Sequence, residues 1–165
     1  MAIIMTVTNQ KGGVGKTTTA AALLYALYER GQRVLGVDLD PQGSLSFSLG
    51  LDTENCATVY DLFKDRVTVD EAITSSRGID LLPANILLSA AELEFNRTGR
   101  EFLLRNKLTH VADRYDYVII DTPPALNVLT VNAYVASDTL VIPMVPEILS
   151  LLGVAQIKET IDTVQ

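Results

Sequence analysis

The chain has 165 residues, of which 48% are hydrophobic and 20% charged, a composition typical of a globular protein and unlike that of a disordered or coiled-coil chain. Thirteen lysines and arginines against twenty aspartates and glutamates give a net charge of -7, so the surface as a whole repels nucleic acid and anionic lipid. A single cysteine and a single histidine exclude an internal disulfide, a zinc framework and most histidine-based catalysis, and together with the lack of a signal peptide they favour a cytoplasmic location.

Along the chain, short runs rich in β-branched residues alternate with longer segments of helical spacing. The short runs predict five buried strands of parallel type, at residues 3–7, 34–37, 79–82, 117–120 and 139–142. The longer segments predict helices at residues 17–30, 59–63, 69–74, 89–95, 98–113, 126–135 and 147–161. Residues 41–58 are expected to be irregular and mobile. The alternation predicts a single α/β domain over residues 1–165, built as a three-layer, doubly wound and mostly parallel sheet.

The strongest motif lies between the first predicted strand and the first predicted helix, where residues 9–19 read Asn-Gln-Lys-Gly-Gly-Val-Gly-Lys-Thr-Thr-Thr. Its glycines allow positive φ angles and bring backbone N–H groups close to an anion, and the helix start adds the positive end of its dipole. Lys16 can neutralise the β- and γ-phosphates of a nucleotide, and the Thr17 hydroxyl can bind Mg²⁺. The predicted phosphate-binding residues are Gly12, Gly13, Val14, Gly15, Lys16, Thr17 and Thr18.

The motif departs from the general pattern G-x-x-x-x-G-K-[ST], because Gln10 stands where that pattern has its first glycine. The run from Lys11 to Thr17 instead resembles the deviant Walker A motif of the ParA/MinD family of P-loop ATPases, which drive plasmid and chromosome partition and related positioning tasks. Residues 37–43 resemble that family's switch I segment, and residues 117–124 resemble its Walker B and switch II segment. The resemblance extends over nearly the whole chain and is closer to the ParA branch than to the MinD branch.

Three acidic residues follow predicted strands near this motif. Asp121 comes after four apolar residues of a buried strand, so its carboxylate is expected at the carboxyl edge of the sheet, where it can hold a water bound to Mg²⁺. The resemblance implies that Asp40 orients or activates the attacking water and that Asp38 supports the magnesium shell. Turn formation before Pro41 is the alternative reading of this pair of aspartates.

The resemblance also implies the cofactors, the assembly and the roles of the remaining residues. ATP and Mg²⁺ are the expected cofactors, and Lys11 is expected to reach the phosphates of the second subunit in an ATP-sandwiched homodimer. The catalytic set is then Lys11, Lys16 and Asp40, and the magnesium ligands are Thr17, Asp38 and Asp121.

The resulting hypothesis is a slow, Mg²⁺-dependent ATPase that acts as a switch in plasmid or chromosome partition or in cargo positioning, stimulated by a ParB-like partner. The alternative is a nucleotide-binding dimerisation module with little hydrolysis of its own. Basic residues concentrate between positions 97 and 114, and they form either a solvated helix face or a nonspecific DNA contact. A membrane partner is not expected, because residues 158–165 lack the basic amphipathic pattern of MinD-like ends.

Members of the family are considerably longer than this chain. We therefore expect that the last strands, part of the adenine pocket and the C-terminal helix of the family have no counterpart in these 165 residues. The apolar surface left without a cover would favour self-association.

Overall fold

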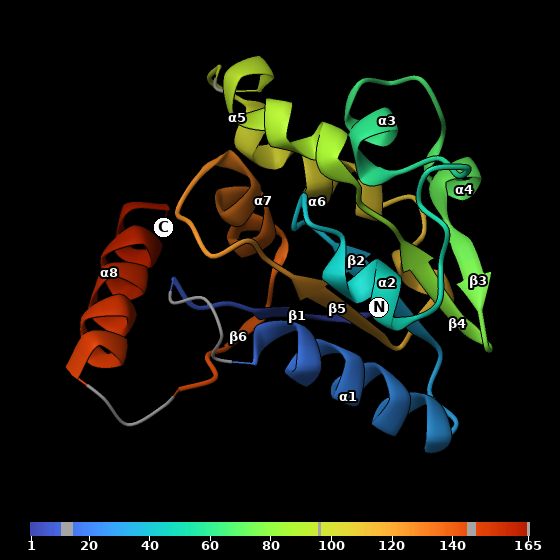
Figure 1. Ribbon diagram of the computed structural model, residues 1–165, viewed down its shortest axis with the longest axis horizontal. Helices are drawn as coiled ribbons and strands as arrows, with labels where there is room; N and C mark the ends of the chain where they lie inside the picture. The colour runs from blue at the N-terminus through green and yellow to red at the C-terminus, as the bar shows by residue number, and fades with distance from the viewer. Residues whose placement is uncertain (11–14, 96, 145–147, 165) are drawn as a thin grey trace.

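In the computed structural model, which describes residues 1–10, 15–95, 97–144 and 148–164, a sheet lies between two layers of helices (Figure 1). The strands of the described residues are β1 (Ile3–Val7), β2 (Val34–Asp38), β3 (Thr74–Ser76), β4 (Ile79–Leu82), β5 (Tyr117–Asp121) and β6 (Thr139–Val141). Their order in the sheet is β3-β4-β2-β5-β1-β6, and the pairing is parallel everywhere except between β3 and β4. The predicted three-layer, mostly parallel α/β fold is confirmed.

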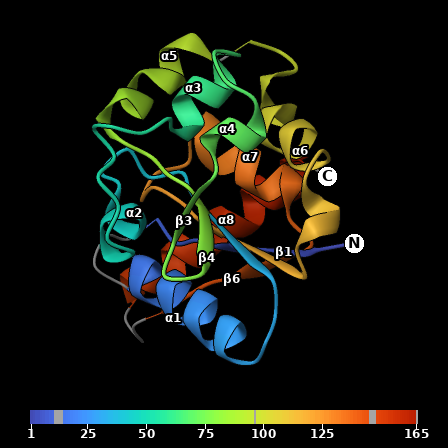
Figure 2. The same cartoon turned by 90° about the vertical axis from the view of Figure 1, so that its right-hand side faces the viewer.

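The helices divide between the two faces of the sheet. One face is covered by α1 (Lys16–Glu29) and α2 (Ser44–Ser48), and the other by α3 (Val59–Phe63), α4 (Val69–Ala72), α5 (Ala91–Glu94), α6 (Leu103–Leu108) and α7 (Val128–Ala136). The helix α8 (Ile148–Val164) lies beside α7 (Figures 1 and 2). Among the described residues, no helix has both the length and the apolar character needed to cross a bilayer.

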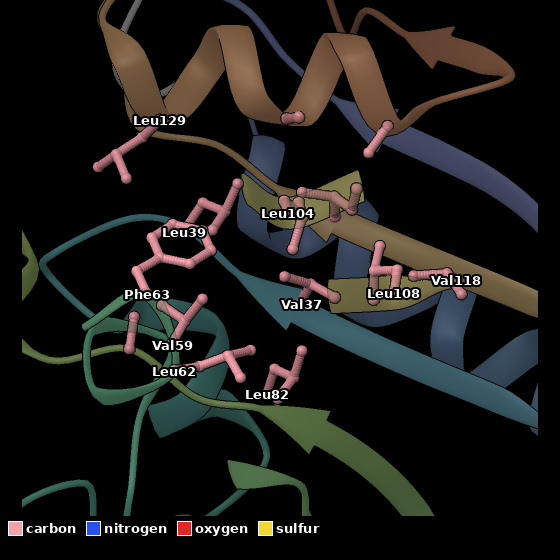
Figure 3. Packing of buried hydrophobic residues seen from close by; sticks show 14 of the residues in the cluster. Val37, Leu39, Val59, Leu62, Phe63, Leu82, Leu104, Leu108, Val118 and Leu129 are labelled. Atoms are coloured by element: carbon pink, nitrogen blue, oxygen red, sulfur yellow. The ribbon is translucent and has the colours of Figure 1, made fainter. Parts of the chain in front are cut away.

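The inner strands β2, β4 and β5 are mostly hydrophobic because both of their faces are largely buried. Along β2, Val34 packs in the cluster under α1, whereas Leu35 and Val37 pack in the cluster on the opposite face. Figure 3 shows this second cluster, in which Leu62 and Phe63 of α3 lie on the same side of the sheet as Val37. This alternation determines which strand residues face α1. It also determines on which face of the sheet the carboxylates at the strand ends lie.

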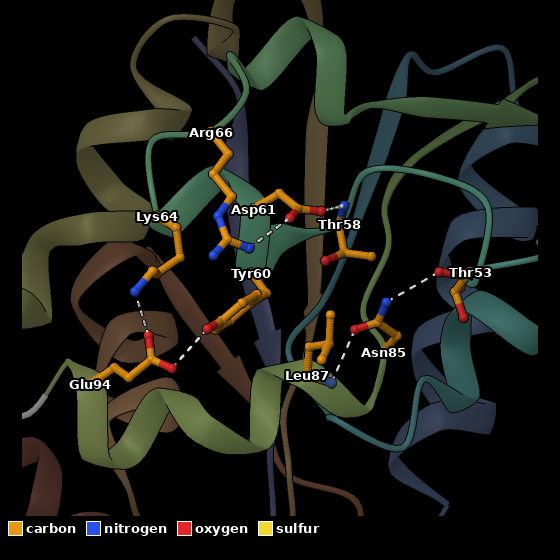
Figure 4. Close-up of polar contacts among 9 residues, drawn as sticks. All are labelled: Thr53, Thr58, Tyr60, Asp61, Lys64, Arg66, Asn85, Leu87 and Glu94. Carbon is orange, nitrogen blue, oxygen red and sulfur yellow. Dashed lines mark hydrogen bonds and ion pairs between the residues drawn. The ribbon is translucent and has the colours of Figure 1, made fainter.

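The outer layer of helices is joined by polar contacts between distant segments (Figure 4). Glu94 of α5 accepts a hydrogen bond of 2.7 Å from the hydroxyl of Tyr60 on α3 and another of 2.7 Å from the ammonium of Lys64, which follows α3 directly. Asn85 donates to the carbonyl oxygen of Thr53 at 3.2 Å. The bonds to Glu94 join α3 to α5, and the bond from Asn85 anchors the segment before α3 to the residues that follow β4.

Two sequence-based expectations about these segments were wrong in detail. Residues 41–58 contain α2, whose five residues are too few to show a helical period in the sequence. The predicted helix at 98–113 is instead divided into the 3₁₀ turn Arg100–Phe102, α6 and the 3₁₀ turn Ala112–Arg114. The edge strand β3 was not predicted, because its three residues, Thr-Ser-Ser, carry no hydrophobic signal.

The packing of α1 on the sheet can be tested at Leu24, which is fully buried in the cluster that joins α1 to β1, β4 and β5. Leu24→Ala removes buried methyl groups and leaves a cavity, so we expect a loss of about 2–5 kcal/mol in the free energy of unfolding. Leu93→Ala, on the exposed surface of α5, is the control and should change it by less than about 0.5 kcal/mol. Urea unfolding of both variants measures the difference; equal effects would contradict this account of the core.

Candidate functional site

The carboxyl ends of β1, β5 and β2 lie side by side, and their last residues are in register. Asp121 is the register partner of both Val7 at the end of β1 and Asp38 at the end of β2. Because register partners in a parallel sheet point to the same face, the two carboxylates are neighbours on the side that α1 covers. This edge is where ligands bind in open α/β sheets.

The helix α1 begins directly beside these carboxylates. Gly15 caps it with a φ angle of 82°, a left-handed conformation that favours glycine, and a glycine has no side chain to occupy the N–H groups of the helix start. Uncapped N–H groups at a helix start are suited to binding an anion. Four of the predicted loop residues lie outside the described residues, and they are Lys11, Gly12, Gly13 and Val14.

The first turn of α1 is linked to the end of β5 by a hydrogen bond of 2.8 Å from the Thr17 hydroxyl to Asp121 Oδ2. Asp121 is fully buried, and its Oδ1 has no hydrogen-bond partner among the described residues. Burial, together with the nearby charge of Asp38, raises the pKa of Asp121 to about 7. A cation or a cation-bound water placed at Oδ1 would satisfy this oxygen and favour the charged carboxylate.

Asp38 is equally buried, but both of its oxygens are engaged by the chain itself. Its Oδ1 accepts from the Asp40 N–H at 3.1 Å, and its Oδ2 accepts from the N–H and the hydroxyl of Ser46 at 3.0 and 2.7 Å. Burial raises the pKa of Asp38 to about 6, and the bonds from Ser46 oppose this rise. Asp38 and Asp121 are therefore adjacent carboxylates with different surroundings.

Asp40 forms a tight turn with the residues that follow it. Its Oδ1 accepts from the Gln42 N–H at 3.0 Å, and its carbonyl oxygen accepts from the Gly43 N–H at 2.8 Å. Gly43 has a φ angle of 66°, and a Cβ there would lie only 2.8 Å from the carbonyl oxygen of Ala84. The turn is thus pressed against the residues after β4, and Asp40 itself is half-buried.

Lys16 carries the positive charge that faces these aspartates. Its residue is only 8% exposed, and burial lowers the pKa of its ammonium, while the charges of Asp121 and Asp40 raise it. Thr18, on the same turn of α1, is exposed. The described residues that the structure brings together at this edge are Lys16, Thr17, Asp38, Asp40 and Asp121.

Two residues at this edge were missed by sequence reasoning. Ser46, on α2, holds Asp38 from a segment that was expected to be irregular. Thr122 follows Asp121 and donates its hydroxyl to the carbonyl oxygen of Val7 at 2.8 Å, which ties the end of β5 to the end of β1. Ser46 belongs to no motif that could have marked it, and Thr122 lies within the segment 117–124 that resembles Walker B and switch II, but that resemblance gave no role to its hydroxyl.

The described residues contain no group of three or more His, Cys, Asp or Glu side chains that could hold a metal ion by themselves. A Mg²⁺ ion at Thr17 and Asp121 would therefore need further oxygen ligands, such as nucleotide phosphates and waters.

The basic residues between positions 97 and 114 are largely engaged with other side chains. Lys107 pairs with Asp65, and Arg114 pairs with Asp70 at 2.5 Å. The guanidinium of Arg105 lies 4.9 Å from the centre of the Phe102 ring. These contacts partly neutralise the stretch within the chain, and its two interpretations, a solvated helix face and a nonspecific DNA contact, both stay predictions.

Comparison with known proteins agrees with this geometry. The family model described as an AAA domain (AAA_31) matches residues 1–165. Over 171 residues the chain is 46% identical to the sporulation initiation inhibitor protein Soj of Bacillus subtilis, covering 100% of this chain and 67% of Soj. The chain belongs to the ParA/Soj family of P-loop ATPases. It is also 44% identical over 168 residues to the chromosome partitioning protein ParA of Caulobacter vibrioides, covering 98% of this chain and 63% of that protein.

The solved structures that resemble this chain include complexes with bound nucleotides. A Mycobacterium smegmatis structure, named cobyrinic acid a,c-diamide synthase with bound ATP analog and magnesium, is 44% identical with a TM-score of 0.95, covering 100% of this chain and 69% of that one. A complex of Cyanothece McdA with ATP is 30% identical with a TM-score of 0.92, covering 98% and 64%. The chain spans between 52% and 67% of the length of the curated relatives it matches.

The raised pKa of Asp121 predicts a pH-dependent stability. Between pH 3.8 and about 7 the folded protein binds a proton at Asp121 more tightly than the unfolded chain does, so this contribution to stability is lost as the pH rises through that range. Asp121→Asn removes it while keeping an acceptor for Thr17. At pH 8 we expect the nucleotide-free variant to be more stable than the wild type by about 1–2 kcal/mol, with a Tm higher by roughly 2–8 °C.

Thermal unfolding across pH 4–8 measures this effect, and the advantage of Asp121→Asn should shrink towards pH 4. Asp162→Asn, at an exposed position of α8, is the matched control and should show no such trend. An Asp121→Asn variant that is less stable than the wild type at pH 8 would contradict the destabilising burial of this charge.

Proposed function

We propose that the chain binds ATP with Mg²⁺ and hydrolyses it slowly, as a switch in chromosome or plasmid partition or in the positioning of another cargo. The observation that carries this proposal is the pairing of Thr17 with Asp121 at the start of α1, where a fully buried carboxylate oxygen has no partner among the described residues. An anion site at a helix start, next to a cation site, is the combination that a magnesium nucleotide requires.

The residues present fit this ligand. Thr17 and Asp121 would hold Mg²⁺ or its bound water, with Asp38 supporting them from the next strand. Mg²⁺ would supply positive charge that neutralises the phosphate oxygens. Lys16 and the N–H groups of the loop from Gly12 to Thr18 would bind the β- and γ-phosphates. Nucleotide complexes of the related McdA and Mycobacterium smegmatis structures support this assignment.

Asp40 is our candidate for the group that orients the attacking water. Its carboxylate is half-buried, carries its charge near Lys16, and is held in a turn at the mouth of the site. The carboxylate would accept a hydrogen bond from the water and so direct the water's lone pair towards the γ-phosphate. The similarity to ParA of Caulobacter vibrioides, which is named a chromosome partitioning protein, supports a role for this chemistry in partition.

In the proposed assembly, two copies sandwich ATP, and Lys11 of each reaches the phosphates of the other. A cation supplied by a second subunit raises the rate of other NTPases by about 10³–10⁵-fold, which explains why such a switch stays slow as a monomer. A ParB-like partner would stimulate hydrolysis and return the protein to its monomeric form.

Two substitutions separate binding from hydrolysis. Lys16→Ala should weaken ATP binding, because it removes the cation that faces the phosphates. Asp40→Ala should keep binding and lower the rate of phosphate release by about 10²-fold, because it removes only the group that orients water. Isothermal titration calorimetry with Mg²⁺-ATP and a phosphate-release assay measure the two quantities.

The same assays decide between the hydrolase and a switch without turnover. If the wild-type chain binds ATP but releases phosphate no faster than Asp40→Ala, it is a nucleotide-binding dimerisation module. Absence of any binding of ATP or ADP at low salt would overturn both readings.

Dimer formation gives a further test. With a non-hydrolysable ATP analogue, light scattering should detect a dimer of the wild type, and Lys11→Ala should remain monomeric while still binding the analogue. Lys158→Ala, at an exposed position of α8, is the control and should dimerise like the wild type. A Lys11→Ala dimer of normal affinity would show that this lysine does not act across the interface.

A further inference from the structure

Ser46 lies at a junction of three segments behind the proposed catalytic aspartate. It is fully buried on α2, and its N–H and hydroxyl both donate to Asp38 Oδ2, at 3.0 and 2.7 Å. The same hydroxyl accepts a hydrogen bond of 3.1 Å from the Ala84 N–H, just beyond β4. One hydroxyl thus connects the end of β4 to the end of β2.

The series of hydrogen bonds continues through Asp38 to Asp40. Asp38 Oδ1 accepts from the Asp40 N–H at 3.1 Å, so the carboxylate of Asp38 is held by Ser46 on one side and itself holds the Asp40 backbone on the other. Hydrogen bonds to a charged acceptor are shorter and stronger than neutral ones, and burial strengthens them further. Movement of Asp38 would therefore be transmitted to Asp40.

A second contact restrains the same segment. Gly43 closes the turn that Asp40 begins, and it approaches the carbonyl oxygen of Ala84 so closely that a Cβ would lie 2.8 Å from it. Ser46 binds the N–H of that same Ala84. The segment from Gly43 to Ser46 is thus held at both ends against Ala84, and Gly43 also closes the turn that begins at Asp40.

We propose that Ser46 is a positioning residue for ATP hydrolysis, which acts through Asp38 to fix Asp40 beside Lys16. This inference rests on the proposed function, since it assigns to Asp40 the orientation of the attacking water. Ser46 itself is a support for the carboxylate of Asp38 and is not a ligand of the nucleotide. A displacement of about 1 Å at a reacting group can lower a rate by about 10²-fold, so the loss of a buried support is expected to affect turnover.

The test compares three variants on α2. Ser46→Ala removes the hydroxyl, and Ser46→Cys nearly preserves its volume but offers only a weak donor. Ser48→Ala is the matched control, because the Ser48 hydroxyl is exposed and donates only to the Ser44 carbonyl oxygen at 2.8 Å. We expect kcat to fall by about 10- to 100-fold in both Ser46 variants, with the Kd for Mg²⁺-ATP changed by less than about threefold. Ser48→Ala should match the wild type in both.

A second readout needs no turnover. Hydrogen exchange of the Ala84 and Asp40 amides, followed by NMR in the nucleotide-free protein, reports directly on the bonds that Ser46 supports. Both amides should exchange at least about tenfold faster in Ser46→Ala and Ser46→Cys than in the wild type. In Ser48→Ala their exchange rates should equal those of the wild type.

The outcomes separate this inference from the proposed function. If the wild type binds no nucleotide, the proposed function fails and the role of Ser46 fails with it. If the wild type hydrolyses ATP and Ser46→Ala has the same kcat and the same exchange rates, only the positioning role is overturned. Recovery of normal kcat in Ser46→Cys would assign the effect to volume instead of the hydrogen bond. Unfolding of both Ser46 variants, seen by circular dichroism, would assign Ser46 to stability and also overturn the proposal.

Discussion

The burial of two neighbouring carboxylates, Asp38 and Asp121, is the constraint on which the rest of this edge of the sheet depends. Both lie where water is excluded, so burial raises the pKa values of both carboxyls, and the charge of Asp38 raises the pKa of Asp121 further. A fold organised only for stability would place apolar side chains at these two strand ends. The neighbouring segments differ in which of these two carboxylates they stabilise by hydrogen bonds.

The two carboxylates receive different numbers of hydrogen bonds from the chain, and this difference determines which of them can bind a ligand. Asp38 receives two hydrogen bonds from Ser46 and one from the Asp40 backbone, whereas the described contacts of Asp121 comprise one from Thr17. Both oxygens of Asp38 are therefore occupied by hydrogen bonds within the chain, whereas Oδ1 of Asp121 has no hydrogen-bond partner among the described residues. In this chain, Asp38 is thus supported by α2 at the end of β2, whereas this oxygen of Asp121 lies at the end of β5 beside α1.

The elements that depend on local interactions along the chain were predicted better than those that depend on contacts between distant segments. The strands at 3–7 and 79–82 and the helix at 59–63 were predicted with their observed bounds, because their hydrophobic pattern is local. The helix expected at 98–113 is broken, since Gly99 adopts a φ angle of 91° and two 3₁₀ turns flank α6. The short helix α2 was missed for the opposite reason, because it is stabilised by contacts with α1 and the strand ends more than by its own five residues.

By itself the sequence determined the alternation of strands and helices, the glycine-rich turn before α1 and the acidic residues at the strand ends, because each is encoded within a few consecutive positions. Only the tertiary structure decided that Asp38 and Asp121, 83 residues apart, are register partners, and that Ser46 and Ala84 meet behind them. The order of strands in a sheet is set by the packing of whole helices on both faces. A linear pattern of residues contains the ends of the strands but not which ends become neighbours.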